Sequence, residues 1–238
     1  MSPEQHLQTL RTESARFAAA AAKARDRHGW RARVPGCPDW DLADLVWHLA
    51  EVQHFWSWLV RTRAPSPAGY PEPVRPADDA LLAFSADQAR ALEDALDGAA
   101  PTDRVWTWAP QQDVAFALRR QAQEATVHRV DAEQVLGEVT PIGADVGLDG
   151  LDEWLEVMVP GVLPDGPPAG AEPVALHAVA ADAERRLFAG SGDLPVATLT
   201  GPAGDLLLAV WRRLPLTAVT VDGDADRARE LLAAVSLD

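Results

Sequence analysis

The chain has 238 residues and a formal net charge of −15 at pH 7, and at about 100 to 200 residues per domain this length predicts one large or two small domains. The negative charge argues against a nucleic-acid or anionic-membrane partner, and the single cysteine, Cys37, excludes an internal disulfide and a cysteine-cluster metal site. No segment has the roughly 18 consecutive apolar residues of a membrane span or the core of a signal peptide, so we expect a cytoplasmic protein without a membrane partner.

The first 143 residues predict four amphipathic helices, at residues 3–28, 41–63, 79–97 and 111–136. The second is the clearest, because its apolar residues from Leu42 to Val60 recur mostly at spacings of three and four. Asp41 can cap its start, and Gly137 suits the end of the fourth helix. Helices of this kind, joined by loops, predict a four-helix bundle over residues 1–143.

The sequence changes character after residue 143, where six basic residues face 16 acidic ones. Glycine and proline crowd residues 141–173, which predicts a linker interrupted by a short helix at 147–159. Beyond it, the sequence predicts three strands and two helices, at residues 174–180, 196–200 and 216–223 and at residues 205–214 and 224–235. Residues 144–238 therefore predict a small α+β domain.

Three side chains could meet around a metal ion in the predicted bundle. A helical wheel at about 100° per residue turns His48 toward the bundle interior and His54 away from it. Glu124 and His128 lie one turn apart on one face of the fourth helix, and Asp131 continues that face. His48, Glu124 and His128 could thus chelate one divalent ion, with Asp131 orienting a ligand or pairing with an arginine. Such spacing also occurs by chance on exposed helices, so spacing alone leaves the metal site open.

Three segments resemble a known family. The segment CPDWDLADLVWHLAEVQHFW (37–56) is similar to a pattern in which a Cys-Pro-x-Trp turn precedes a helix bearing Asp-Leu-x-x-His-Leu. The segment EATVHRVDAEQVLG (124–137) is similar to a Glu-x-x-x-His-Arg-x-Asp helix. Together with LTGPAGDLLLAVWRRLP (199–215), they resemble the mycothiol-dependent maleylpyruvate isomerase family, a branch of the DinB-like metalloprotein superfamily. The resemblance implies a DinB-like four-helix bundle followed by a small sterol-carrier-like α+β domain, with a divalent metal, typically zinc, on His48, Glu124 and His128.

The same resemblance implies an enzyme that uses mycothiol as its thiol cosubstrate. A zinc-bound thiolate would attack an electrophilic or anionic small molecule, giving either a cis–trans isomerase or an S-transferase. The family pattern Trp-x-Arg-Leu-Pro points to a catalytic arginine, Arg213 or its neighbour Arg212, although arginine at a helix C-terminus is also ordinary dipole compensation. An arginine there would place the active site between the domains. Phe55 and Trp40 could line the pocket, while packing is the commoner role of such aromatic residues.

Two other functions fit the same residues. A zinc hydrolase would use the open metal position for water and would need a general base, for which Asp131 lies on the right face. In the other alternative, the chain is a non-catalytic module that binds a small molecule, and the metal is structural or absent. Metal content and activity toward a thiol and an electrophile distinguish the three hypotheses.

Overall fold

The structure is a computed structural model that describes residues 1–188 and 194–235. The chain divides into two compact units, Met1–Thr140 and Pro141–Asp238. The boundary predicted after residue 143 lies just beyond this division. Across the described residues, no helix combines the length and the apolar character needed to cross a membrane.

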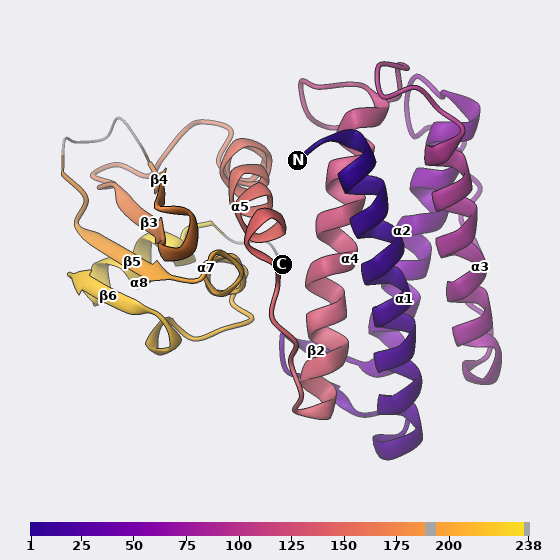
Figure 1. Ribbon diagram of the computed structural model, residues 1–238. Helices are drawn as coiled ribbons and strands as arrows, with labels where there is room; N and C mark the ends of the chain where they lie inside the picture. The colour runs from indigo at the N-terminus through magenta and orange to yellow at the C-terminus, as the bar shows by residue number, and fades with distance from the viewer. Residues whose placement is uncertain (189–193, 236–238) are drawn as a thin grey trace. The chain divides into compact units, whose positions relative to one another are not determined.

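The first unit is a bundle of four long helices, α1 (Pro3–His28), α2 (Leu42–Thr62), α3 (Asp78–Asp97) and α4 (Val114–Leu136), as Figure 1 shows. Their positions confirm the bundle predicted from apolar spacing. The side chains of Asp41 and Asp44 form a capping box at the start of α2. At the C-terminal end of α4, Gly137 adopts a left-handed conformation with φ of 70°. Local signals in the sequence thus fix where the helices that carry the candidate ligands begin and end.

A short hairpin that the sequence analysis did not predict precedes α2. Its strands are β1 (Arg33–Val34) and β2 (Cys37–Asp41), which pair antiparallel. Because β2 ends at the N-cap of α2, the segment read as a turn is an extended strand that runs directly into the helix.

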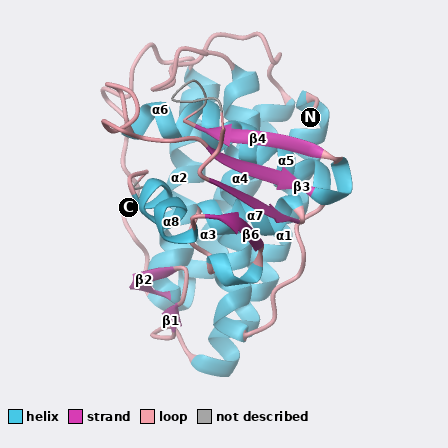
Figure 2. Cartoon of the chain, turned by 90° about the vertical axis from the view of Figure 1, so that its left-hand side faces the viewer, coloured by secondary structure: helices cyan, strands magenta, loops and turns pink. Residues whose placement is uncertain are grey.

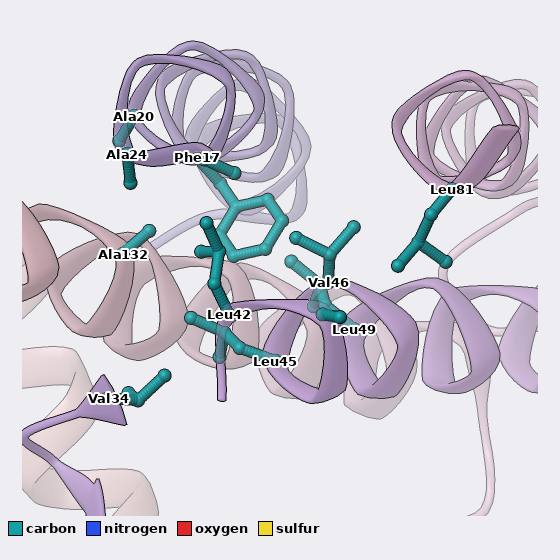
Figure 3. Close-up of a cluster of buried hydrophobic side chains, with 12 residues drawn as sticks. Phe17, Ala20, Ala24, Val34, Leu42, Leu45, Val46, Leu49, Leu81 and Ala132 are labelled. Atoms are coloured by element: carbon teal, nitrogen blue, oxygen red, sulfur yellow. The ribbon is translucent and has the colours of Figure 1, made fainter. Parts of the chain in front are cut away.

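A cluster of buried apolar side chains joins the hairpin to all four helices (Figure 3). Its labelled members include Phe17 from α1, Val34 from β1, Leu81 from α3, Ala132 from α4, and Leu42, Leu45, Val46 and Leu49 from α2. Close packing of this kind leaves side chains and backbone little freedom. Since Leu49 is 1% exposed and directly follows His48, the packing fixes the backbone that presents this histidine.

The second unit contains a four-stranded mixed sheet in the order β4-β3-β5-β6 (Figure 2). The strands are β3 (Val174–Ala178), β4 (Ala183–Leu187), β5 (Ala197–Gly201) and β6 (Thr220–Gly223). The central strands β3 and β5 run parallel, and the outer strands pair antiparallel to them. The α+β class is confirmed, but β4 was missed, because its sequence AERRL has no β-branched or aromatic residue.

Helices of the second unit differ from the prediction in two places. The segment at 141–173, predicted as a linker with one short helix at 147–159, forms α5 (Ala144–Glu153), a π-helical turn (Trp154–Met158) and α6 (Val159–Val162). Helix α7 (Ala203–Val210) ends four residues before the predicted end at 214. The last helix, α8 (Ala225–Ala233), lies within the predicted segment 224–235. The early end of α7 follows from Arg212, whose φ of 59° lies in the left-handed region that a helix cannot continue through.

Candidate metal centre

The structure brings together the three side chains predicted to bind a metal. His48 extends from α2, and Glu124 and His128 extend from α4. The Oε1 atom of Glu124 lies 3.2 Å from Nε2 of His48 and 3.2 Å from Nε2 of His128. One ligand atom from each residue lies within 4.8 Å of the other two. This group, called the metal cluster below, converges on one point from two helices.

Two further side chains orient the metal cluster. The Nδ1 atom of His128 lies 2.9 Å from Oδ2 of the fully buried Asp131, so the imidazole can donate there and keep the Nε2 lone pair toward the cluster. On the other side, Nη2 of Arg120 donates to Oε2 of Glu124 at 3.0 Å. Because Arg120 engages Oε2, the other carboxylate oxygen, Oε1, is the one that faces both histidines. Arg120 was not predicted as part of the site from the sequence, although its i, i+4 spacing to Glu124 indicates such a contact.

The metal-free cluster is stabilised by opposite charges. Burial raises the pKa of Glu124, but His128, His48 and Arg120 outweigh it and hold that pKa well below its usual range. Burial has the opposite effect on His128 and lowers its pKa, but the carboxylates of Glu124 and Asp131 outweigh burial and raise the pKa of His128 to about 9. His128 is therefore protonated at neutral pH, and a bound metal ion has to displace that proton.

The donor set fits a divalent ion such as zinc. Two imidazole nitrogens and one carboxylate oxygen are ligands that zinc prefers, and three protein ligands leave a position for an external ligand. The side chain of His48 is 32% exposed, so the cluster can be reached from solvent. Cys37 stands outside the donor set, because its Sγ atom lies 3.7 Å from Oδ2 of Asp131, to which the thiol can donate.

Of the two aromatic residues considered as pocket walls, Trp40 borders the metal cluster. Its ring centroid lies 4.6 Å from that of His48 and 6.0 Å from that of His128. The ring of Phe55 instead packs edge-on against Tyr70 at 5.0 Å and Trp106 at 6.4 Å. The unpredicted strand β2 thus supplies the aromatic side chain beside the ligands.

Arg212 and Arg213 lie in the second unit, in the turn after α7. Nη2 of Arg212 donates to the carbonyls of Ala233 and Val235, at the C-terminal end of α8, where helix carbonyls lack partners within the helix. The guanidinium of Arg213 lies 5.9 Å from the ring centroid of Trp211, and its Nη1 donates to the Trp211 carbonyl. Arg212 is therefore engaged in holding α8, whereas a catalytic role for Arg213 stays a prediction.

A helical bundle with two histidines and a glutamate converging from two helices, followed by an α+β unit, defines a candidate metalloprotein of two units. Residues 10–133 match the family described as the mycothiol maleylpyruvate isomerase N-terminal domain, and residues 145–230 match the family described as the MDMPI C-terminal domain. The chain therefore belongs to the mycothiol maleylpyruvate isomerase family.

Solved structures share this fold. Crystal structures of the mycothiol-dependent maleylpyruvate isomerase and of a mutant of that enzyme superpose with TM-scores of 0.69 and 0.70. In both comparisons the identity is 14%, with 94% of this chain and 95% of the other covered. No curated protein sequence matches the chain. The structural likeness therefore shows the fold of both units, whereas the chemistry has to be inferred from the residues of this chain.

Proposed function

We propose that this protein is a mycothiol-dependent metalloenzyme that adds a thiol to an electrophilic small molecule. In an isomerase the thiolate would add to the double bond of a maleylpyruvate-like substrate, allow rotation about the resulting single bond and then leave to give the trans isomer. In an S-transferase it would stay on the product as a thioether. The observation that carries the proposal is the metal cluster, in which His48, Glu124 and His128 point one atom each at a common position in a chain of this family.

Each residue around the metal cluster has a definable task in this chemistry. A divalent ion held by the cluster would lower the pKa of a coordinated thiol toward neutrality. Arg120 holds Glu124 with one oxygen toward the histidines. Once a metal ion has displaced the proton of His128, Asp131 would accept from Nδ1 and keep the neutral imidazole in the tautomer that presents Nε2. The ring of Trp40 lies beside both histidine rings and would form one wall of the site.

The nucleophile and the substrate contacts follow from the remaining residues. Cys37, the single cysteine, contacts the carboxylate of Asp131, so the attacking thiol has to come from a cosubstrate. An anionic substrate would be repelled by a chain of net charge −15, so it needs a local cation. The residue we propose for that task is Arg213, because it matches the family pattern Trp-x-Arg-Leu-Pro, with its neighbour Arg212 as the alternative.

Metal content tests the site directly. We expect about one zinc ion per chain in the purified protein, and loss of that zinc in the variants His48→Ala and Glu124→Ala. The matched control is His54→Ala, because His54 lies on the same helix but pairs with the hydroxyl of Tyr70 at 2.7 Å. Zinc retained in the first two variants would show that the ion binds elsewhere.

Activity separates the two reactions. The zinc-loaded protein is incubated with mycothiol and either maleylpyruvate or the electrophile monochlorobimane. Formation of the trans isomer identifies an isomerase, whereas a conjugate without isomerisation identifies an S-transferase. If neither product forms, the proposal fails and the hydrolase or the non-catalytic module remains. The hydrolase is not favoured by the structure, because its candidate base, Asp131, is fully buried and engaged by His128.

A further inference from the structure

A buried glutamine near the metal cluster lacks a partner among the described residues. Gln121 of α4 is 1% exposed, and neither Oε1 nor Nε2 of its side chain has a hydrogen-bond partner. Buried amides in folded proteins are normally hydrogen-bonded, because removing one from water without a replacement partner is unfavourable. An unpaired buried amide of this kind is suited to form hydrogen bonds with a bound ligand.

Gln121 occupies the face of α4 that carries the metal cluster. It precedes Glu124 by three residues and His128 by seven, so at about 100° per residue the three lie within about 60° of one another around the helix. One helical turn, roughly 5 Å along the axis, separates Gln121 from Glu124. The polar neighbours Arg120 and Asp131 are bound to the cluster ligands, whereas the Gln121 amide is not.

The chemistry of this side chain selects a ligand group. A glutamine amide is uncharged and offers both an acceptor oxygen and donor hydrogens. A secondary amide matches both, since its carbonyl accepts and its N–H donates, whereas a carboxylate is better matched by an arginine. In an N-acylated aminothiol, the amide nitrogen is only three bonds from the sulfur. A thiol whose sulfur reaches the metal cluster would therefore carry its amide to about the level of Gln121.

We propose that Gln121 determines thiol specificity by hydrogen-bonding the amide of an N-acylated aminothiol whose sulfur binds at the metal cluster. This inference rests on the proposed function, because it needs a thiol as the external ligand. It also has a consequence that involves neither metal nor thiol, which is that the unpaired amide destabilises the free protein.

The first test is therefore thermal unfolding of the metal-free protein. Gln121→Leu removes an unpaired buried amide and is expected to raise Tm. The matched control is Gln53→Leu on α2, which is also 1% exposed but whose Nε2 donates to Oγ of Ser14 at 3.2 Å, so its loss is expected to lower Tm. Gln121→Met, closer in shape, gives the same comparison if leucine does not fit. A lowered Tm in both Gln121 variants would overturn the inference, because it would show that the amide is paired within the folded chain.

The second test compares two thiols of matched length and no charge, N-acetylcysteamine and 2-ethoxyethanethiol, of which only the first has an amide. They are titrated into protein loaded with Co²⁺, and binding is followed by the thiolate-to-cobalt charge-transfer band. We expect the parent protein to prefer N-acetylcysteamine by at least about tenfold. Gln121→Leu should reduce the preference to within about twofold, and Gln53→Leu should keep it.

The outcomes separate the inference from the proposed function. An equal preference in the parent and in Gln121→Leu would overturn the role of Gln121 while leaving a thiol-binding metal centre in place. Absence of the charge-transfer band with both thiols would overturn the proposed function, and the specificity role of Gln121 with it. A preference lost in Gln121→Leu but kept in Gln53→Leu supports both.

Discussion

Replacing Asp131 by asparagine tests whether the buried carboxylate tunes the metal ligand His128. Asp131 is fully buried, and its Oδ2 atom accepts from the imidazole at 2.9 Å. Asparagine keeps the shape of the side chain and removes its charge. Loss of a carboxylate partner of a metal-bound histidine typically weakens metal binding by about 10- to 100-fold, or about 1.4 to 2.7 kcal/mol.

A second effect of the same substitution has the opposite sign at neutral pH. Asp131 helps to raise the pKa of His128 to about 9, so a proton competes with the metal at pH 7. Asp131→Asn lowers this pKa and weakens the competition, which offsets part of the lost affinity. As the pH rises above 9 the imidazole becomes mostly neutral in both proteins, and the lost affinity then dominates.

Zinc affinity is therefore measured by competition with a chelator of known affinity, at pH 7 and at about pH 9.5. We expect Asp131→Asn to weaken zinc binding by about 10- to 100-fold at the higher pH and by less at pH 7. The control is Asp113→Asn, the N-cap of the same helix, because asparagine caps about as well as aspartate. An unchanged affinity of Asp131→Asn at the higher pH would refute the role assigned to the carboxylate.

Three further predictions concern stability. In the metal-free protein the pKa of His128 is raised from 6.5 to about 9. The stability linked to this shift, at most about 3 kcal/mol, is therefore present below pH 6.5 and lost as the pH rises through 9. Urea unfolding at these pH values should show the loss, and His128→Ala should remove this pH dependence. Arg129, fully buried, donates to Glu13 at 2.6 Å, and Arg129→Met should cost about 3 to 5 kcal/mol in the same assay; a loss below about 1 kcal/mol would contradict the buried pair. A Cβ atom at Gly223 would lie 2.4 Å from the carbonyl oxygen of Val196, and the φ angle of Gly223 is 101°. Gly223→Ala should therefore make the second unit sensitive to limited proteolysis without changing the zinc content of the protein. Resistance to proteolysis equal to that of the parent would contradict the predicted clash.

The bundle could be predicted from the sequence because its signals are local, whereas the metal ligands, which spacing alone left open, were implied by the family resemblance. Apolar spacing from Leu42 to Val60 and the cap at Asp41 define α2 without reference to other segments. The i, i+4 spacing of Glu124 and His128 puts both on one helix face, and the wheel turns His48 inward. The distances of 3.2 Å between these side chains agree with that geometry, although the pairing of α2 with α4 itself came from the bundle hypothesis.

Elements that are held by hydrogen bonds to another segment of the chain were missed, even where that segment is a close neighbour in the sequence. The segment CPDWD becomes β2 because it pairs with Arg33–Val34, and proline and aspartate would otherwise favour a turn. Strand β4 has weak strand propensity and is held by the backbone of β3, from Val174 opposite Leu187 to Ala178 opposite Ala183. The end of α7 depends likewise on Arg212, which turns away to bind carbonyls of α8.

The partners of buried polar side chains mark the limit of sequence reasoning in this chain. Gln53 and Gln121 are the same residue type, lie inside neighbouring helices and are equally buried at 1% exposed. Propensity and periodicity treat them alike, yet Gln53 reaches Ser14, 39 residues earlier, whereas Gln121 reaches no partner among the described residues. The difference arises only when α1 and α2 pack, because that contact brings Ser14 within reach of one amide. A specificity role for Gln121 could therefore be inferred only from the folded chain, since hydrogen-bond satisfaction, rather than residue type, sets it apart.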